Sequence, residues 1–128
     1  KRRAAIARSS LALVVSGTAT LETALVGRAQ VIFYKVHWLS YMLGRLLVKL
    51  KYFGLPNIIA GRMVAPELLQ GQLTADALVL HTRRLLADPD AQAEAKAAQF
   101  EVRSVLPPAG AGARAAAAVL EVARANAH

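Results

Sequence analysis

The sequence contains no cysteine and few aromatic residues, and it carries only half as many acidic as basic side chains. The absence of cysteine excludes disulfide scaffolds, thiolate nucleophiles and cysteine-ligated zinc. No apolar run reaches the roughly 20 residues that a membrane-spanning helix requires. Each run is interrupted by a charged residue, namely Glu22, Arg28, Lys35, Arg45 or Lys49. The sequence therefore predicts no transmembrane segment.

The first residues offer a basic segment followed by an apolar run, which is superficially similar to a secretory signal peptide. A Ser-Gly-Thr turn and Glu22 follow that run, and they fit a strand, turn and helix better than a cleavage site. We therefore expect no secretory signal. The chain opens without Met on a short Ala-rich basic segment typical of the end of a helix, which we interpret as a cut through a larger fold.

The 128 residues are enough for one ordinary domain with a buried core. Sixteen Lys and Arg residues against eight Asp and Glu residues give a net charge of +8. That excess favours anionic partners, which include phosphates, nucleic acid and an anionic membrane surface. The charge does not choose among them.

The pattern of apolar residues predicts an α/β fold with parallel strands. Residues 11–15 are a continuous apolar run, typical of a strand buried on both faces. A Ser-Gly-Thr turn and a helix ending near Gly27 follow, and the β-branched and aromatic run 31–34 predicts the next strand. Two strands joined by a helix indicate a parallel βαβ unit.

The remainder of the chain is predicted to be mainly helical. Apolar spacing indicates a helix over 38–50, whereas 55–61 is expected to be a strand end and loop and 66–69 a brief helical turn. Thr74 and Asp88 each begin a helix, the first ending near Ala87. A Pro- and Gly-rich break at 107–112 precedes an Ala-rich terminal helix over 113–125.

The first group of candidate site residues follows the first predicted strand. It consists of Ser16, Gly17, Thr18 and Thr20. Free amides at a helix N-terminus and the helix dipole suit a diphosphate. Alternatively, these residues simply turn the chain and cap the helix. Glu22, one helical turn later, either orients a hydroxyl-bearing substrate or braces a neighbouring basic side chain.

The second group comprises Asn57, Arg62 and Glu67, with Gln70 in support. An amide both donates and accepts, a guanidinium forks onto phosphate, and a carboxylate accepts bonds from a ribose diol. These residue types together suit a nucleoside diphosphate. The alternative is a loop of turn residues in which Arg62 pairs with Glu67 and Gln70 is solvated.

One face of the predicted 38–50 helix and the residues after it mix interfacial aromatic side chains with cations. These are Trp38, Tyr41, Arg45, Lys49 and Tyr52. Such a face suits anionic lipid headgroups. The alternative is that the aromatic side chains pack against another part of the protein and the cations are solvated.

The two groups gain specificity from their order and spacing. The strand-turn-helix at 11–26, Tyr-Lys-Val at 34–36, Arg-Leu-Leu-Val-Lys at 45–49, Leu-Pro-Asn at 55–57, Ala-Gly-Arg at 60–62 and Pro-Glu-Leu-Leu-Gln at 66–70 follow one another as in lipid-A-disaccharide synthases. The chain resembles the C-terminal part of that family over residues 5–106.

This resemblance implies a GT-B fold, of which the chain would form the second Rossmann-like half without its earliest strands. Residues 1–106 would be the donor-nucleotide-binding half, and residues 107–128 a flexible break and a terminal helix. The family transfers 2,3-diacylglucosamine from UDP to 2,3-diacylglucosamine 1-phosphate with inversion. The residues of the first group would face the diphosphate, Asn57 and Arg62 would stabilise departing UDP, and Glu67 would face the ribose.

The resemblance further implies that no metal or cofactor is needed, because amide dipoles and a guanidinium can stabilise the leaving group. The catalytic base would lie in the other half, so the chain alone should bind UDP without transferring sugar. We expect a homodimer at the cytoplasmic face of the inner membrane of a Gram-negative bacterium. The rival hypotheses are another GT-B UDP-sugar enzyme and a non-catalytic basic module at a membrane surface. Nucleic acid is disfavoured because the basic residues are spread along the chain.

Overall fold

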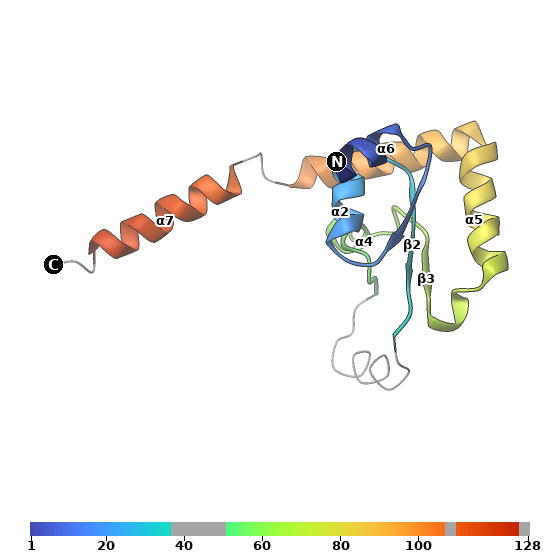
Figure 1. The fold of residues 1–128 in the computed structure, drawn as a ribbon, viewed down its shortest axis with the longest axis horizontal. Coiled ribbons are helices and arrows are strands. Elements are labelled where there is room, and N and C mark those ends of the chain that lie inside the picture. The colour runs from blue at the N-terminus through green and yellow to red at the C-terminus, as the bar shows by residue number, and fades with distance from the viewer. Residues whose placement is uncertain (37–50, 107–109, 126–128) are drawn as a thin grey trace.

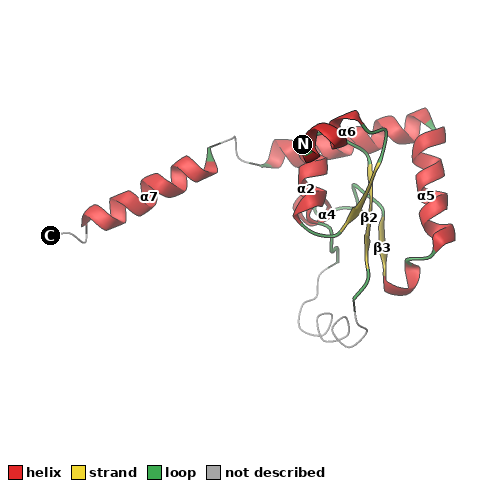
Figure 2. Cartoon of the chain, viewed as in Figure 1, coloured by secondary structure: helices red, strands yellow, loops and turns green. Residues whose placement is uncertain are grey.

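The computed structural model describes residues 1–36, 51–106 and 110–125. Within them a three-stranded parallel sheet has the order β1-β2-β3, formed by Ala12–Val15, Gln30–Tyr34 and Glu67–Leu69. The helices are α1 (Arg2–Arg8), α2 (Thr18–Leu25), α4 (Leu55–Ala60), α5 (Ala75–Ala87), α6 (Pro89–Val105) and α7 (Ala111–Ala125), with a short 3-10 turn at Gln70–Gln72. Figures 1 and 2 show the sheet between helices on either side. The predicted α/β class, the parallel βαβ unit and the helical tail are confirmed.

The alternation of side chains along β2 gives the sheet two different faces. Val31 on one face packs with Leu68 of β3 and Leu85 of α5. The opposite face lies toward α2, α4 and α6. The cluster there contains Ala24 of α2, Ala98 and Val102 of α6, and Val64, which follows α4. Helices therefore cover both faces, as expected for parallel strands.

β1 is the edge strand of the described sheet and is only partly covered. Leu13 pairs in register with Val31, and Val15 pairs with Phe33. The side chains of Leu13 and Val15 are 49% and 52% exposed, respectively. The apolar face of β1 is therefore not fully covered by the described helices.

Helix boundaries follow the expected capping chemistry. The Thr74 side chain accepts a bond from the Ala77 amide at the start of α5, and Asp88 accepts bonds from the Asp90 and Ala91 amides at the start of α6. Helix α2 begins at Thr18 and ends shortly before Gly27, whose φ of 71° is readily adopted only by glycine. These ends are confirmed as predicted.

Two segments differ from their predictions. Residues 55–61, predicted as a strand end and loop, contain helix α4, because Pro56 occupies its first turn and Gly61 closes it with a φ of 67°. Residues 66–69, predicted as a helical turn, contain strand β3, which pairs with β2. The predicted helix over 38–50 lies outside the described residues.

Helix α7 lies apart from the sheet (Figure 1). Its apolar side chains Val119, Leu120 and Val122 are 67%, 55% and 60% exposed. No helix in the described part of the chain is long and apolar enough to cross a membrane.

A buried polar network joins the sheet to α2 and α6. Gln30 Nε2 donates to the Thr20 carbonyl at 3.0 Å and to Gln99 Oε1 at 2.9 Å, and Gln99 Nε2 donates to the Val64 carbonyl at 2.8 Å. Gln99 has no exposed surface. Because these groups cannot reach water, each needs its partner in the folded state.

Replacing Gln99 by alanine should therefore lower the free energy of unfolding by about 2–4 kcal/mol, since a buried carbonyl loses its donor and a cavity forms. Gln92→Ala is the matched control on the same helix. It removes only an acceptor for Lys96 Nζ at 2.8 Å and should cost less than about 1 kcal/mol. Urea denaturation monitored by circular dichroism measures both, and equal losses would contradict the buried network.

Candidate functional site

The turn after β1 lies at the carboxyl end of a parallel strand, where open α/β sheets bind ligands. The Ser16 amide donates to the Phe33 carbonyl at 2.9 Å, which continues the ladder past Val15. Gly17 then caps α2 with a φ of 153°. Gly17 and Thr18 are exposed, and a β-carbon at Gly17 would meet no atom within 4 Å. The turn is therefore accessible to a ligand.

Thr20 differs from its neighbours in this group. It is fully buried, and its hydroxyl donates to the Gly17 carbonyl at 2.6 Å. The side chain thus braces the turn from inside, whereas Ser16 is half-buried and Thr18 reaches solvent. A ligand at this turn would therefore contact the exposed residues rather than Thr20.

Asn57 is completely buried at the start of α4. Its Oδ1 accepts bonds from the Val64 and Ala65 amides at 2.7 and 2.9 Å. Its Nδ2 donates to the Ala65 carbonyl at 2.8 Å and to Glu67 Oε1 at 2.7 Å. All four hydrogen-bonding positions of the amide are occupied, so Asn57 ties α4 to the segment that enters β3.

Glu67 connects this amide to the turn after β1. Its carboxylate accepts bonds from the Phe53 amide at 3.0 Å and the Gly54 amide at 2.8 Å. The Ser16 hydroxyl donates to the Phe53 carbonyl at 3.2 Å. The structure therefore brings Ser16, Glu67 and Asn57 into one connected group around the loop that precedes α4.

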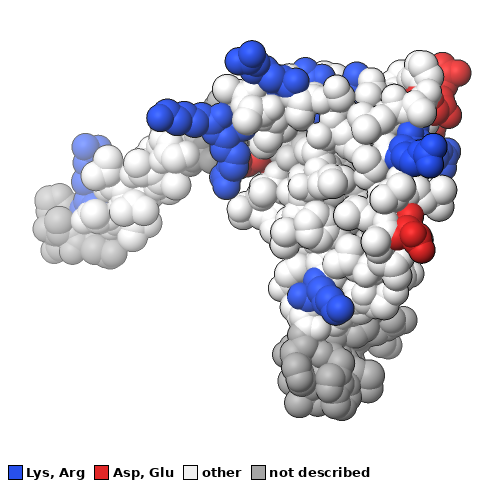
Figure 3. All heavy atoms as spheres, turned by 45° about the vertical axis from the view of Figure 1, so that its right-hand side comes forward, with Lys and Arg blue, Asp and Glu red and all other residues white. Residues whose placement is uncertain are grey.

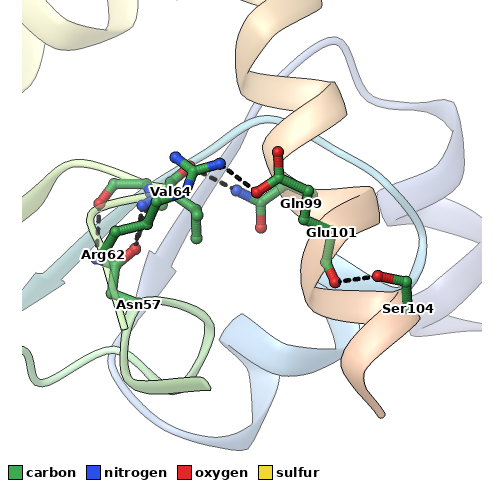
Figure 4. Close-up of polar contacts among 7 residues, drawn as sticks. Asn57, Arg62, Val64, Gln99, Glu101 and Ser104 are labelled. Carbon is green, nitrogen blue, oxygen red and sulfur yellow. Dashed lines mark hydrogen bonds and ion pairs between the residues drawn. The ribbon is translucent and has the colours of Figure 1, made fainter. Parts of the chain in front are cut away.

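Arg62 lies apart from this group, past the opposite end of α4. Its guanidinium forms an ion pair with Glu101 on α6, and both side chains are more than half exposed. Figure 4 shows Arg62 reaching across to Glu101, with Asn57 of α4 and Val64 drawn near it. The alternative pairing of Arg62 with Glu67 is wrong, because Glu67 is occupied by backbone amides and Asn57. The four described residues from the second group therefore do not converge on one pocket.

The supporting residues are both engaged. Glu22 forms a two-point ion pair with Arg2, at 2.9 and 2.5 Å, so the bracing interpretation of Glu22 is confirmed. Gln70, predicted in the alternative to be solvated, instead bonds the Val36 backbone through both ends of its amide. Among described residues no group of three acidic or His side chains could hold a metal ion.

The predicted membrane face is described only at Tyr52, which is half-buried with Lys51 Nζ 5.4 Å from its ring centre. The remaining members, Trp38, Tyr41, Arg45 and Lys49, lie outside the described residues. In Figure 3 the Lys and Arg side chains on the visible face are separated by uncharged surface rather than gathered in one stripe.

Hollows at the two ends of the sheet differ in size. A small one of about 30 Å³ at the carboxyl ends of β2 and β3 is lined by Tyr34, Val36, Phe53, Leu69 and Gln70. A larger one of about 390 Å³ lies between α5, α6 and the segment before β3. Among the described residues, the small hollow alone is too small for a nucleoside diphosphate.

Sequence reasoning missed the roles of Gln30, Gln99 and Phe53. A glutamine within an apolar strand is the only signal for the buried network, and nothing in the sequence marks the Phe53 backbone as the link between Ser16 and Glu67. Both depend on contacts between residues 37 to 69 positions apart.

Comparison with known proteins gives a consistent picture. The family model described as lipid-A-disaccharide synthetase matches residues 1–119. The chain is similar to lipid-A-disaccharide synthases of Chromobacterium violaceum, with 49% identity over 94% of the chain and 31% of the relative, and of Anaeromyxobacter dehalogenans, with 45% identity over 93% and 31%. A third, from Syntrophus aciditrophicus, is 42% identical over 91% of the chain and 30% of its own length. The chain thus spans less than a third of the length of these relatives.

Proposed function

Since the chain belongs to the lipid-A-disaccharide synthetase family, we propose that it forms the donor-nucleotide-binding part of a lipid A glycosyltransferase. The donor would be UDP-2,3-diacylglucosamine and the acceptor 2,3-diacylglucosamine 1-phosphate, joined with inversion to give lipid A disaccharide 1-phosphate. The fold proposed for the longer protein is GT-B. The exposed Leu13 and Val15 on edge strand β1 support further protein that covers this face of the sheet, because strand side chains project from the face.

The observation that carries this proposal is the open turn at the end of β1. Exposed Gly17 and Thr18 begin α2, whose first amides have no acceptor within the helix and whose dipole favours negative charge. The nearby carboxylates are compensated, Glu22 by Arg2 and Glu67 by backbone amides. The turn therefore suits the diphosphate of UDP without a metal or cofactor.

The connected side chains hold this turn in place. Ser16 fixes the loop before α4 through the Phe53 carbonyl. Asn57 and Glu67 act from behind that loop, while Arg62 would need to leave Glu101 to reach a departing phosphate. Sugar transfer by the chain alone is not expected, because the catalytic base belongs to the other half of the enzyme.

UDP binding by the folded chain tests the proposal. We expect calorimetry to show saturable heat with UDP and at least tenfold weaker binding of uridine, which lacks the diphosphate. Thr18→Glu should raise the Kd for UDP at least tenfold, a change of about 1.4 kcal/mol, because the new charge repels the ligand. The same charge in the first turn favours the helix, so folding should not suffer.

Ala75→Glu is the matched control, because it places the same charge at the first position of α5. It should leave the Kd for UDP unchanged. Absence of UDP binding by the wild-type chain, or equal losses in the two variants, would overturn this assignment of the turn.

We also propose that the protein is a homodimer that uses α7. The exposed Val119, Leu120 and Val122 on this helix offer apolar surface for a second copy. Light scattering should give twice the 13.6 kDa mass of the chain. Leu120→Glu should shift the chain to monomer, whereas the neighbouring Glu121→Gln should not. A purely monomeric wild-type chain would contradict the proposal.

Location at the cytoplasmic face of the inner membrane of a Gram-negative bacterium is also proposed, supported by the net charge of +8 and by acylated substrates. The chain should float with vesicles that contain phosphatidylglycerol and lose binding as salt rises, since surface charges are screened. Equal flotation with phosphatidylcholine vesicles, or none with either, would contradict an electrostatic contact.

A further inference from the structure

The first residue of β3, Glu67, and the residue directly after β3, Gln70, hold the chain on either side of residues 37–50. Gln70 binds Val36, the last described residue before that segment, by donating from Nε2 to the carbonyl and accepting from the amide at Oε1, each at 3.1 Å. Glu67 binds the amides of Phe53 and Gly54, just after the segment. Strand β3 and the residue that follows it therefore hold the backbone both before and after residues 37–50.

The Gln70 contact extends the pairing between strands. The last backbone pair of β2 and β3 is Tyr34 with Leu69, and the next contact uses the side-chain amide of Gln70 in place of a peptide group. Gln70 adopts a φ of 50°, the one positive φ among the described residues other than glycine. A sparsely populated backbone conformation persists only where surrounding contacts enforce it, and here the two bonds to Val36 do so.

The Glu67 contact needs a close approach. A β-carbon at Gly54 would lie 2.9 Å from Glu67 Oε1 and 2.5 Å from Ile32 Cδ1. A side chain at this position would therefore force the Glu67 carboxylate or the Ile32 side chain to shift. The same carboxylate also accepts from Asn57, so its two oxygens receive three N–H bonds and are directed toward the protein.

We propose that Glu67 and Gln70 are positioning residues of the donor site. Gln70 fixes Val36, and Glu67 fixes the backbone of Phe53 and Gly54. Because the Ser16 hydroxyl bonds the Phe53 carbonyl, the position of the turn after β1 depends on this backbone. The inference rests on the proposed function, because it assumes that this turn binds the diphosphate. It assigns Glu67 an indirect role, distinct from contact with the ribose.

Gln70→Gly tests Gln70, because glycine accepts the positive φ and removes only the side-chain bonds. Amide hydrogen exchange by NMR should show at least tenfold faster exchange at Val36, and calorimetry at least fivefold weaker UDP binding. Gln72→Gly in the same exposed turn is the matched control and should change neither. Glu67→Gln should speed exchange at Phe53 and Gly54 and weaken UDP binding to a similar degree.

The outcomes separate the two proposals. UDP binding by the wild-type chain with unchanged affinity in Gln70→Gly, despite faster exchange at Val36, would overturn the positioning role and leave the donor site intact. Unchanged exchange at Val36 would overturn the anchor itself. No UDP binding by the wild-type chain would overturn the proposed function and, with it, a positioning role for that ligand. Thermal unfolding of each variant shows whether the fold is retained.

Discussion

The arrangement of the loop at the carboxyl edge of the sheet depends on the hydrogen bonds that the Glu67 carboxylate accepts. A half-buried charge is costly unless hydrogen bonds replace its water, and here amides from Phe53, Gly54 and Asn57 do so. These donors come from the loop before α4 and from α4 itself, so satisfying one charge fixes both against β3. The N-terminal end of α4, with its partial positive charge, is also the favourable place for a carboxylate. Removing this charge would release the loop that Ser16 contacts.

Charged side chains around the turn after β1 are likewise compensated by partners within the protein. Glu22 is on the helix that begins at this turn, where an uncompensated carboxylate would repel a diphosphate. Its two-point contact with Arg2 cancels that charge, although a surface pair of this kind adds little to stability. Arg62 is likewise paired with Glu101, so among the described residues the proposed diphosphate would meet backbone amides at this turn rather than the Arg62 guanidinium.

Local chemistry made much of the fold predictable from the sequence. The apolar run before Ser16 predicted β1, and the caps at Thr74 and Asp88 predicted the starts of α5 and α6, because each signal involves residues close in sequence. The prediction failed at 55–61 and 66–69. Residues 55–61 contain Pro56, and proline is well suited to the first turn of a helix as well as to a loop. Strand β3 has three residues, which are too few to show a strand periodicity. The extended conformation of residues 67–69 is set by pairing with β2.

The local structure of the candidate site was predictable for the same reason. The turn formed by Ser16, Gly17 and Thr18 between a strand and a helix is a local feature, while their contact with a ligand stays a prediction. Asn57 and Glu67 were identified as important, but residue type alone cannot distinguish a group that faces a ligand from one that holds the backbone. Burial decides between them. Asn57 has no exposed surface, and all four of its hydrogen-bonding positions are occupied within the protein. Its amide therefore holds the backbone, and the exposed turn is the part that would contact the proposed ligand.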